Sequence, residues 1–160
     1  MGPNPREAAL SAREKELWRA FVRFSGSVTS AVERELFAAA GLSGADFQIL
    51  ARLHESEGQR MSQKQLGELV GWTATRMSHQ LARMQKRGFV DRAAAGRGRL
   101  MTISLTDTGQ RTYESALPAH AQSVRAHFLR HLDAKSGDSA LRFMREDGSS
   151  VITEADDSVP

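Results

Sequence analysis

The chain has 160 residues, of which 40% are hydrophobic and 26% are charged, which is enough for one globular domain with its own core. It contains no cysteine, which excludes a disulfide framework, a thiolate metal site and a cysteine nucleophile. It has no apolar run near the ~20 residues needed to span a bilayer and no signal-peptide pattern, so we expect a cytoplasmic protein without a membrane segment.

The formal net charge of +3 is unevenly distributed. The segment from Arg60 to Arg99 contains nine basic and two acidic residues and carries +7, which leaves −4 for the rest of the chain. A basic module in an acidic frame is typical of a surface that meets a polyphosphate, because neutralised phosphates release condensed counterions. The alternative is a solvated surface that is basic without a nucleic-acid partner, and composition alone does not decide between the two.

The first part of the chain predicts two helices after a flexible start over 1–10. Over 11–40, apolar residues recur at steps of three and four, which is typical of a long amphipathic helix. Gly41 ends this helix, and a shorter one is expected over 46–54. The first helix is too long for the short elements after it to cover, so we expect part of its apolar stripe to face another subunit.

Two further helices have clear start signals. Ser62 and Gln65 form a capping-box pattern at the start of a helix over 62–70. Thr73 caps a helix over 73–87, and the two-residue turn between the helices contains glycine. Two helices joined in this way predict a helix-turn-helix. Their expected shared core is Leu66, Leu69, Val70, Met77, Leu81 and Met84.

The second of these helices has a polar face that is suited to the major groove of DNA. With Met77 buried, Thr75 and His79 point almost directly away from the core at ~100° per residue. Arginine can bind guanine O6 and N7, and hydroxyl groups can bind bases or phosphates. A solvated amphipathic helix is the alternative interpretation. The candidate DNA-contacting residues on the two helices are Ser62, Thr73, Thr75, Arg76, Ser78, His79 and Arg83.

A β-hairpin is predicted directly after the helix-turn-helix. Its first strand covers 89–92, and its return strand covers 99–105, where apolar and polar residues alternate. The tip over 93–98 is rich in alanine and glycine and contains Arg97, and Arg99 stands two residues later at the start of the return strand. We expect these arginines to reach the DNA backbone or the minor groove, although they could also be solubilising charges. A helix-turn-helix with such a hairpin is a winged helix.

These residues resemble the multiple antibiotic resistance regulators, the MarR family, over about 17–144. The resemblance rests on the long first helix, the helix-turn-helix, "MQKRGFVDR" before the wing and "ISLTDTGQ" after it. The last stretch is similar to the family's Leu-Thr-x-x-Gly, with Leu105, Thr106 and Gly109 at those positions, and Thr106 also suits a helix cap. The resemblance implies a homodimeric winged-helix transcription regulator, most often a repressor of nearby genes, that small and frequently aromatic ligands release from DNA.

One position departs from the family pattern. The family's wing commonly reads Asp-x-Arg, in which the aspartate orients the arginine that enters the minor groove. Here Arg99 matches the arginine, but Arg97 stands at the position of the aspartate. We therefore expect Arg99 to keep its role without that partner, in a wing that is more cationic and more mobile than usual.

The rest of the chain predicts a helix over 106–132 with a kink or break at Pro118, a short helix over 138–146, and a disordered acidic tail. The fold class expected is mainly α with a small β-hairpin wing, a winged helix-turn-helix on a helical dimerisation platform. The expected regions are a flexible start (1–10), a dimerisation region (11–40 and 106–146), the winged helix-turn-helix (41–105) and the tail (147–160).

The sequence offers little for the other kinds of site. His127 and His131 are four residues apart and could hold a metal, but no third ligand is placed, so we expect neither a metal site nor a cofactor. No catalytic constellation is present, and an enzyme is not expected. The resemblance implies an effector pocket, near which Trp18, Phe21 and Phe47 are the candidate aromatic residues, although all three suit a hydrophobic core equally well. The expected partners are a palindromic double-stranded operator, a second copy of the chain and a small effector. A winged-helix module for protein association or nonspecific DNA coating is the alternative.

Overall fold

The computed structural model describes residues 9–94 and 101–153. Its elements are α1 (Ala12–Ala40), α2 (Gly44–Glu55), a short 3-10 helix (Glu57–Gln59), β1 (Arg60–Ser62), α3 (Gln63–Val70), α4 (Ala74–Lys86), β2 (Val90–Ala94), β3 (Met101–Leu105), α5 (Asp107–His127), a second 3-10 helix (Leu129–His131) and α6 (Ala134–Thr153). The fold is mainly α with a small sheet, as predicted. Within the described ranges, no helix has both the length and the apolar character needed to cross a membrane.

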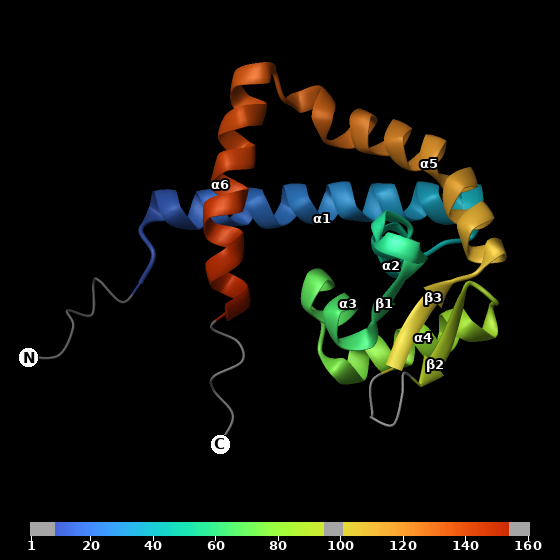
Figure 1. Ribbon diagram of the computed structural model, residues 1–160. Coiled ribbons are helices and arrows are strands. Elements are labelled where there is room, and N and C mark those ends of the chain that lie inside the picture. Colours follow the sequence, from blue (N-terminus) through green and yellow to red (C-terminus); the bar gives the residue numbers. More distant parts are fainter. Residues whose placement is uncertain (1–8, 95–100, 154–160) are drawn as a thin grey trace, which may run out of the picture.

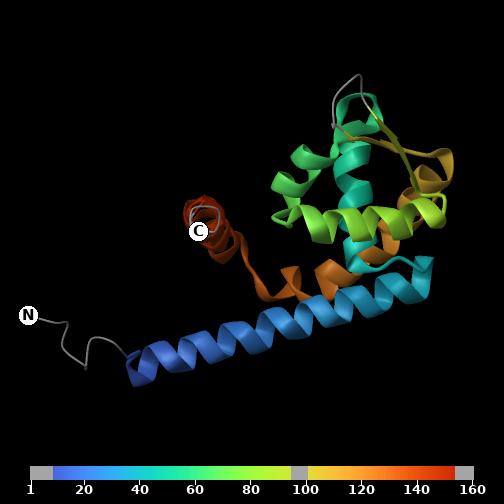
Figure 2. The same cartoon turned by 90° about the horizontal axis from the view of Figure 1, so that it is seen from below.

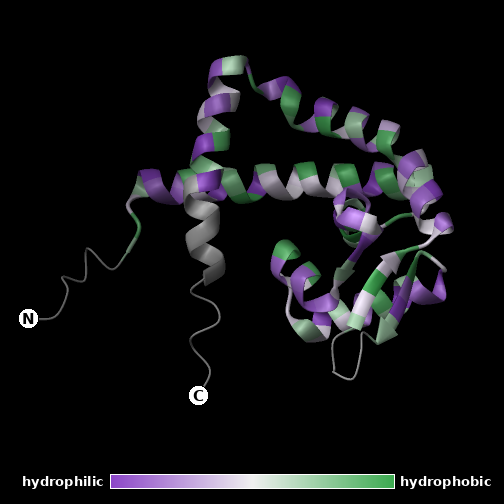
Figure 3. Cartoon of the chain, in the orientation of Figure 1, coloured by the Kyte–Doolittle hydropathy of each residue, from purple (hydrophilic) through white to green (hydrophobic). Residues whose placement is uncertain are grey.

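Helix α1 is the long base of the molecule, and α5 runs back along it (Figure 1). The elements from α2 to β3 form a separate body on one side of these two helices, and α6 turns away from both (Figures 1 and 2). Hydrophobic residues continue along α1 over the stretch that lies beyond the winged helix (Figure 3). In this region Leu17, Trp18 and Phe21 are exposed.

The sheet has the order β1-β3-β2 and is antiparallel throughout. The central strand β3 places Ile103 opposite Met61 on one side and opposite Arg92 on the other. Ile103 is fully buried, so the wing is attached to the core at this point. The hairpin was predicted, but β1 was not, because three residues show no alternation that would separate them from a loop.

Local sequence signals correctly predict several helix ends. Ser62 forms a complete capping box with Gln65, Thr73 caps α4, and Thr106 caps α5, all as predicted. Gly41 ends α1 in the left-handed conformation, at φ 63°. The large apolar side chains that are completely buried are Leu36, Leu42, Ile49, Leu50, Leu53, Leu66, Met77, Leu81, Met84, Val90 and Ile103.

The expected core was wrong at Leu69, which is 55% exposed. Gly67 is buried, and a Cβ at this position would lie 3.3 Å from the Trp72 carbonyl oxygen, so this side of α3 faces inward. Leu69 is two residues further on, about 200° around the helix, and therefore points outward.

The C-terminal helices also differ from the prediction. Helix α5 continues through Pro118 and ends at His127, where Phe128 leaves the helical conformation at φ −123°. Helix α6 starts at Ala134, because Asp133 and Ser136 exchange hydrogen bonds at its first turn, and it continues to Thr153. Residues 147–153, assigned from the sequence to a disordered tail, are therefore helical. Residues 1–8 and 154–160, which include most of the predicted flexible start and the end of the tail, lie outside the described residues.

Candidate nucleic-acid interface

Helix α4 presents one apolar and one polar face, as the periodicity predicts. Met77 and Leu81 are fully buried on the inner side, and Thr75 and His79 are exposed on the opposite side. Arg76 and Arg83 are exposed as well, whereas Ser78 is half-buried. The helix begins with Thr73, whose hydroxyl oxygen accepts a hydrogen bond from the Arg76 amide at 3.3 Å. The start of α4 is thus an exposed, polar surface on a rigidly packed helix.

Ser62 has a structural task at the start of α3. Its hydroxyl oxygen accepts a hydrogen bond from the Gln65 amide at 3.2 Å, and its hydroxyl donates to Gln65 Oε1 at 2.7 Å. Because both roles of this hydroxyl are used in the cap, Ser62 is better suited to fixing α3 than to binding a base.

A polar network that was not predicted holds α4 against the corner between α1 and α2. Asp46 is buried and accepts hydrogen bonds from Gln80 Nε2 at 2.7 Å and from Arg87 Nη1 at 2.9 Å. Arg87 also donates to the Gly41 carbonyl oxygen at 2.7 Å, and Arg83 donates to Gln80 Oε1. The network therefore links the candidate DNA-contacting residue Arg83 to the end of α1.

Sequence reasoning missed Asp46 because it placed the start of the second helix there. The signal that could have found it is the pattern Ser43-x-x-Asp46, a capping box that the structure contains in full. Its partners Gln80 and Arg87 are 34 and 41 residues away and carry no local signal.

The wing is joined to the rest of the body through its first strand and its last residues. Arg92 on β2 donates to Gln63 Oε1 on α3 at 3.2 Å. At the other end, the Thr106 hydroxyl donates to the Gly88 carbonyl oxygen at 2.6 Å and accepts from the Gly109 amide at 2.9 Å. The candidate wing residues Arg97 and Arg99 lie outside the described residues.

Gly109 explains physically why a glycine follows the Leu-Thr pair. A Cβ at this position would lie 2.1 Å from the Phe89 carbonyl oxygen, which is far inside van der Waals contact. The start of α5 can therefore pack directly on the backbone that enters the wing only if residue 109 has no side chain.

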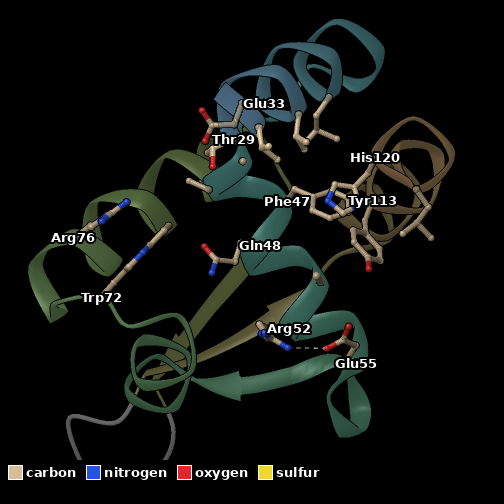
Figure 4. Close-up of a pocket in the computed structure, with 17 residues that line it drawn as sticks. Thr29, Glu33, Phe47, Gln48, Arg52, Glu55, Trp72, Arg76, Tyr113 and His120 are labelled. Carbon is tan, nitrogen blue, oxygen red and sulfur yellow. Dashed lines mark hydrogen bonds and ion pairs between the residues drawn. The ribbon is translucent and has the colours of Figure 1, made fainter. Parts of the chain in front are cut away.

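An open cavity of about 630 Å³ lies where α1, α2 and α5 meet the turn before α4. On one wall, the Phe47 ring stacks on His120 at 4.2 Å between centroids and lies 5.1 Å from Tyr113 (Figure 4). On another wall, the Arg76 guanidinium lies over the Trp72 ring, 4.1 Å from its centroid. Burial lowers the pKa of His120 below its usual value. The cavity thus combines aromatic surfaces with one residue of the helix that is expected to read DNA.

The structure brings only one of the three expected pocket residues to this cavity. Phe47 lines it, whereas Trp18 and Phe21 lie on the first half of α1, with their ring centroids 5.8 Å apart, and do not line it. The other aromatic lining residues, Trp72 and Tyr113, were not singled out, because an aromatic residue at helical spacing is as well suited to a core.

The histidine pair is split between two elements. His127 is the last residue of α5 and its Nε2 lies 2.7 Å from Glu35 Oε1, whereas His131 lies in the following 3-10 helix, beside Phe24. Over 9–94 and 101–153, no three His, Cys, Asp or Glu side chains are grouped so that they could hold a metal ion.

Comparisons with known proteins agree with this geometry. The model of the MarR family matches residues 40–100. Two similar solved structures are MarR family transcriptional regulators from Streptomyces coelicolor. AbsC is 28% identical with a TM-score of 0.84, over 89% of this chain and 97% of AbsC. Sco3205, solved in complex with DNA, is 26% identical with a TM-score of 0.86, over 89% of this chain and 94% of Sco3205.

A third structure, the organohalide-sensing transcriptional regulator RdhR bound to 2,4-dichlorophenol, has the same fold at 20% identity and a TM-score of 0.78, over 95% of this chain and 88% of that one. A search of curated protein sequences found no match. The capped helix-turn-helix, the strands of the wing and the glycine that packs against them therefore lie in a chain whose residues 40–100 match the MarR family, and whose fold is that of MarR family transcriptional regulators.

Proposed function

We propose that the chain is a homodimer that binds a palindromic double-stranded operator and represses transcription until a small ligand releases it. The observation that carries the proposal is the exposed polar face at the start of α4, with Thr75, Arg76 and His79 on a helix that is packed and clamped on its other side. Such a helix fits the major groove, where an arginine can bind guanine through two hydrogen bonds. Arg97 and Arg99 are the proposed wing contacts with the backbone or the minor groove, and Thr73, Ser78 and Arg83 complete the proposed interface.

The dimer is supported by apolar surface that the single chain leaves uncovered. Trp18 and Phe21 on α1 are 58% and 56% exposed, and Phe143 on α6 is 65% exposed. Monomers rarely expose so many large apolar side chains. A second copy that covers them also spaces two α4 helices for two operator half-sites about one turn of DNA apart, ~34 Å.

Ligand release is supported by the cavity between the long helices and the helix-turn-helix. Its aromatic wall of Phe47, Tyr113 and His120 suits a flat aromatic molecule. The phenol held by RdhR is a molecule of this kind. A ligand there contacts α1, α5 and the start of α4 together. It therefore changes the position of α4, the helix proposed to read DNA, relative to the helices proposed to form the dimer.

The test is footprinting and gel-shift titration on the DNA upstream of the chain's own gene, beside a shuffled fragment of equal composition. We expect one protected palindrome, release by a member of a panel of phenols and aromatic acids, and lower transcription from a reporter that carries the site. Arg76→Ala should cost about 1–3 kcal/mol on the operator and relax the preference at one base pair in each half-site. Equal weakening on both fragments would contradict the reading role of Arg76.

The alternative functions give different results in the same experiment. A nonspecific coating protein shows no preferred site, and a protein-association module shows no protection at all. Light scattering without DNA tests the dimer separately, and a mass of 17.6 kDa, that of one chain, at micromolar concentration would exclude it.

A further inference from the structure

Gln80 carries a buried amide on the inner side of α4, and the chemistry of its partner fixes the orientation of this amide. The residue is 4% exposed, and its Nε2 donates to Asp46 Oδ1 at 2.7 Å. A carboxylate only accepts hydrogen bonds, so the amide must present its NH2 group to Asp46. The amide oxygen Oε1 therefore faces the other way, where it accepts a hydrogen bond from Arg83.

The Asp46 carboxylate is itself held in one position. Its Oδ2 accepts from the Ser43 amide at 3.0 Å, from the Ser43 hydroxyl at 2.8 Å and from Arg87 Nη1 at 2.9 Å. Its other oxygen, Oδ1, is thus left for Gln80. The direction in which Gln80 presents Oε1 is therefore set by the capped start of α2 and not by solvent.

Arg83 is an exposed cation that is oriented without being neutralised. Its Nη2 donates to the uncharged amide of Gln80. Within 9–94 and 101–153, no carboxylate forms an ion pair with Arg83. A guanidinium has five N–H donors, so most of them stay available to an anion outside the chain. A carboxylate in the place of the amide would have compensated the charge.

The place of Arg83 on α4 favours a phosphate over a base as this anion. Arg83 follows Arg76 by seven residues, which puts it on the same flank of the helix, within ~20°, and ~10 Å further along the axis. Residues at the start of a recognition helix reach the base edges, and the major groove between its sugar-phosphate walls is ~12 Å wide. A side chain on the flank and beyond the reading residues therefore reaches a wall of the groove.

We propose that Asp46 and Gln80 form a relay that holds Arg83 ready for a phosphate of the DNA backbone. Asp46 and Gln80 are then positioning residues for DNA binding, although neither touches DNA. The inference rests on the DNA binding proposed above. Such a relay strengthens binding because a long, flexible side chain that is ordered beforehand does not have to be ordered in the complex.

The test is a double-mutant cycle of Gln80→Met and Arg83→Gln on the upstream fragment and its shuffled counterpart. Arg83→Gln should weaken binding to both fragments and make the slope of log affinity against log salt less negative by about 0.9 per bound chain. Gln80→Met fills the buried space and removes Oε1, and it should weaken binding about 2- to 10-fold per bound chain. In the Arg83→Gln background, Gln80→Met should have no further effect. The matched control Gln85→Met, at an exposed position of α4, should leave binding unchanged.

A second variant, Asp46→Asn, keeps the shape of the relay and reverses its polarity. An asparagine that keeps its oxygen for Ser43 and Arg87 turns its NH2 group toward Gln80. The Gln80 amide must then turn over, so that its own NH2 group faces the Arg83 guanidinium and two donors meet. Asp46→Asn should therefore weaken DNA binding, and the part of this loss that depends on Arg83 should equal that of Gln80→Met. If thermal denaturation shows that Gln80→Met does not fold, the cycle is run with Asp46→Asn.

Three results would overturn the inference. The first is a double variant in which the two losses multiply, because Gln80 would then only support the fold. The second is an unchanged salt slope in Arg83→Gln. The third is a loss in Arg83→Gln that is confined to the upstream fragment, which would make Arg83 a base-reading residue. The proposed operator is judged separately: a chain without preference for the upstream fragment loses that proposal, while the cycle on the shuffled fragment still decides this one.

Discussion

Arg87 at the end of α4 donates a hydrogen bond to Asp46 at the start of α2, over 2.9 Å between Nη1 and Oδ2. The Asp46 side chain is 5% exposed, whereas that of Arg87 is 42% exposed. The carboxylate also accepts from Gln80, and it completes the capping box with Ser43. One buried group therefore fixes the start of one helix and the orientation of the helix proposed to read DNA.

Removal of this carboxylate should destabilise the protein markedly. Asp46→Ala leaves Gln80 without its partner in the core, which costs about 1–3 kcal/mol in free energy of unfolding, while solvent still reaches Arg87. The matched control is the exposed pair Lys64 and Glu68 on α3, where Glu68→Ala should cost less than about 0.5 kcal/mol. Urea unfolding measures both values, and equal values would show that the Asp46 network does not hold α4.

Gly109 should tolerate no side chain. The Cβ of Gly109→Ala would lie 2.1 Å from the Phe89 carbonyl oxygen, so either α5 or the backbone at the wing must move, and we expect a loss of about 1–3 kcal/mol. Gly26 in the middle of α1 has no atom within 4 Å of such a Cβ. Gly26→Ala should therefore stabilise the protein by about 0.5–1 kcal/mol. Thermal denaturation of the two variants measures both effects. An unchanged stability of Gly109→Ala would refute the close packing of α5 on the Phe89 backbone.

Features that depend on residues close together in the sequence could be predicted, whereas those that depend on distant residues could not. The caps at Ser62 and Thr73 were predictable, because a cap depends on residues three positions apart. Strand β1 was not, because its three residues become a strand only by pairing with β3, which comes about 40 residues later. The partners of Asp46 and the place of Arg76 on the cavity wall were missed for the same reason, since both depend on how α4 packs against distant elements.

His120 should make the stability depend on pH. Burial lowers its pKa from the usual 6.5, so between the two values the unfolded chain binds more protons than the native chain. The contribution of neutral His120 is therefore complete above pH 6.5 and is lost as the pH falls below it. His120→Phe keeps a ring against Phe47 and removes the titration. As the pH falls from 7 to 5.5, the free energy of unfolding of the variant should rise relative to that of wild type. A constant difference between the two proteins over this range would contradict a buried, titrating His120.

The wing offers a test in which charge and orientation act in opposite directions. Arg97→Asp restores the Asp-x-Arg pattern of the family, which orients Arg99, but it replaces a cation with an anion. Each phosphate contact contributes about −0.9 to the slope of log affinity against log salt, so the loss of attraction should dominate at low salt.

Near physiological salt, where the Debye length is ~8 Å, the electrostatic loss should shrink, and the better orientation of Arg99 should recover part of the affinity. Salt titrations of Arg97→Asp and Arg99→Ala on one operator fragment measure both effects. Arg99→Ala should lower both the affinity and the slope, because it removes one of the two cations that are proposed to contact the DNA. If Arg99→Ala leaves both unchanged, the wing does not touch the DNA, and specificity must come from α4 alone.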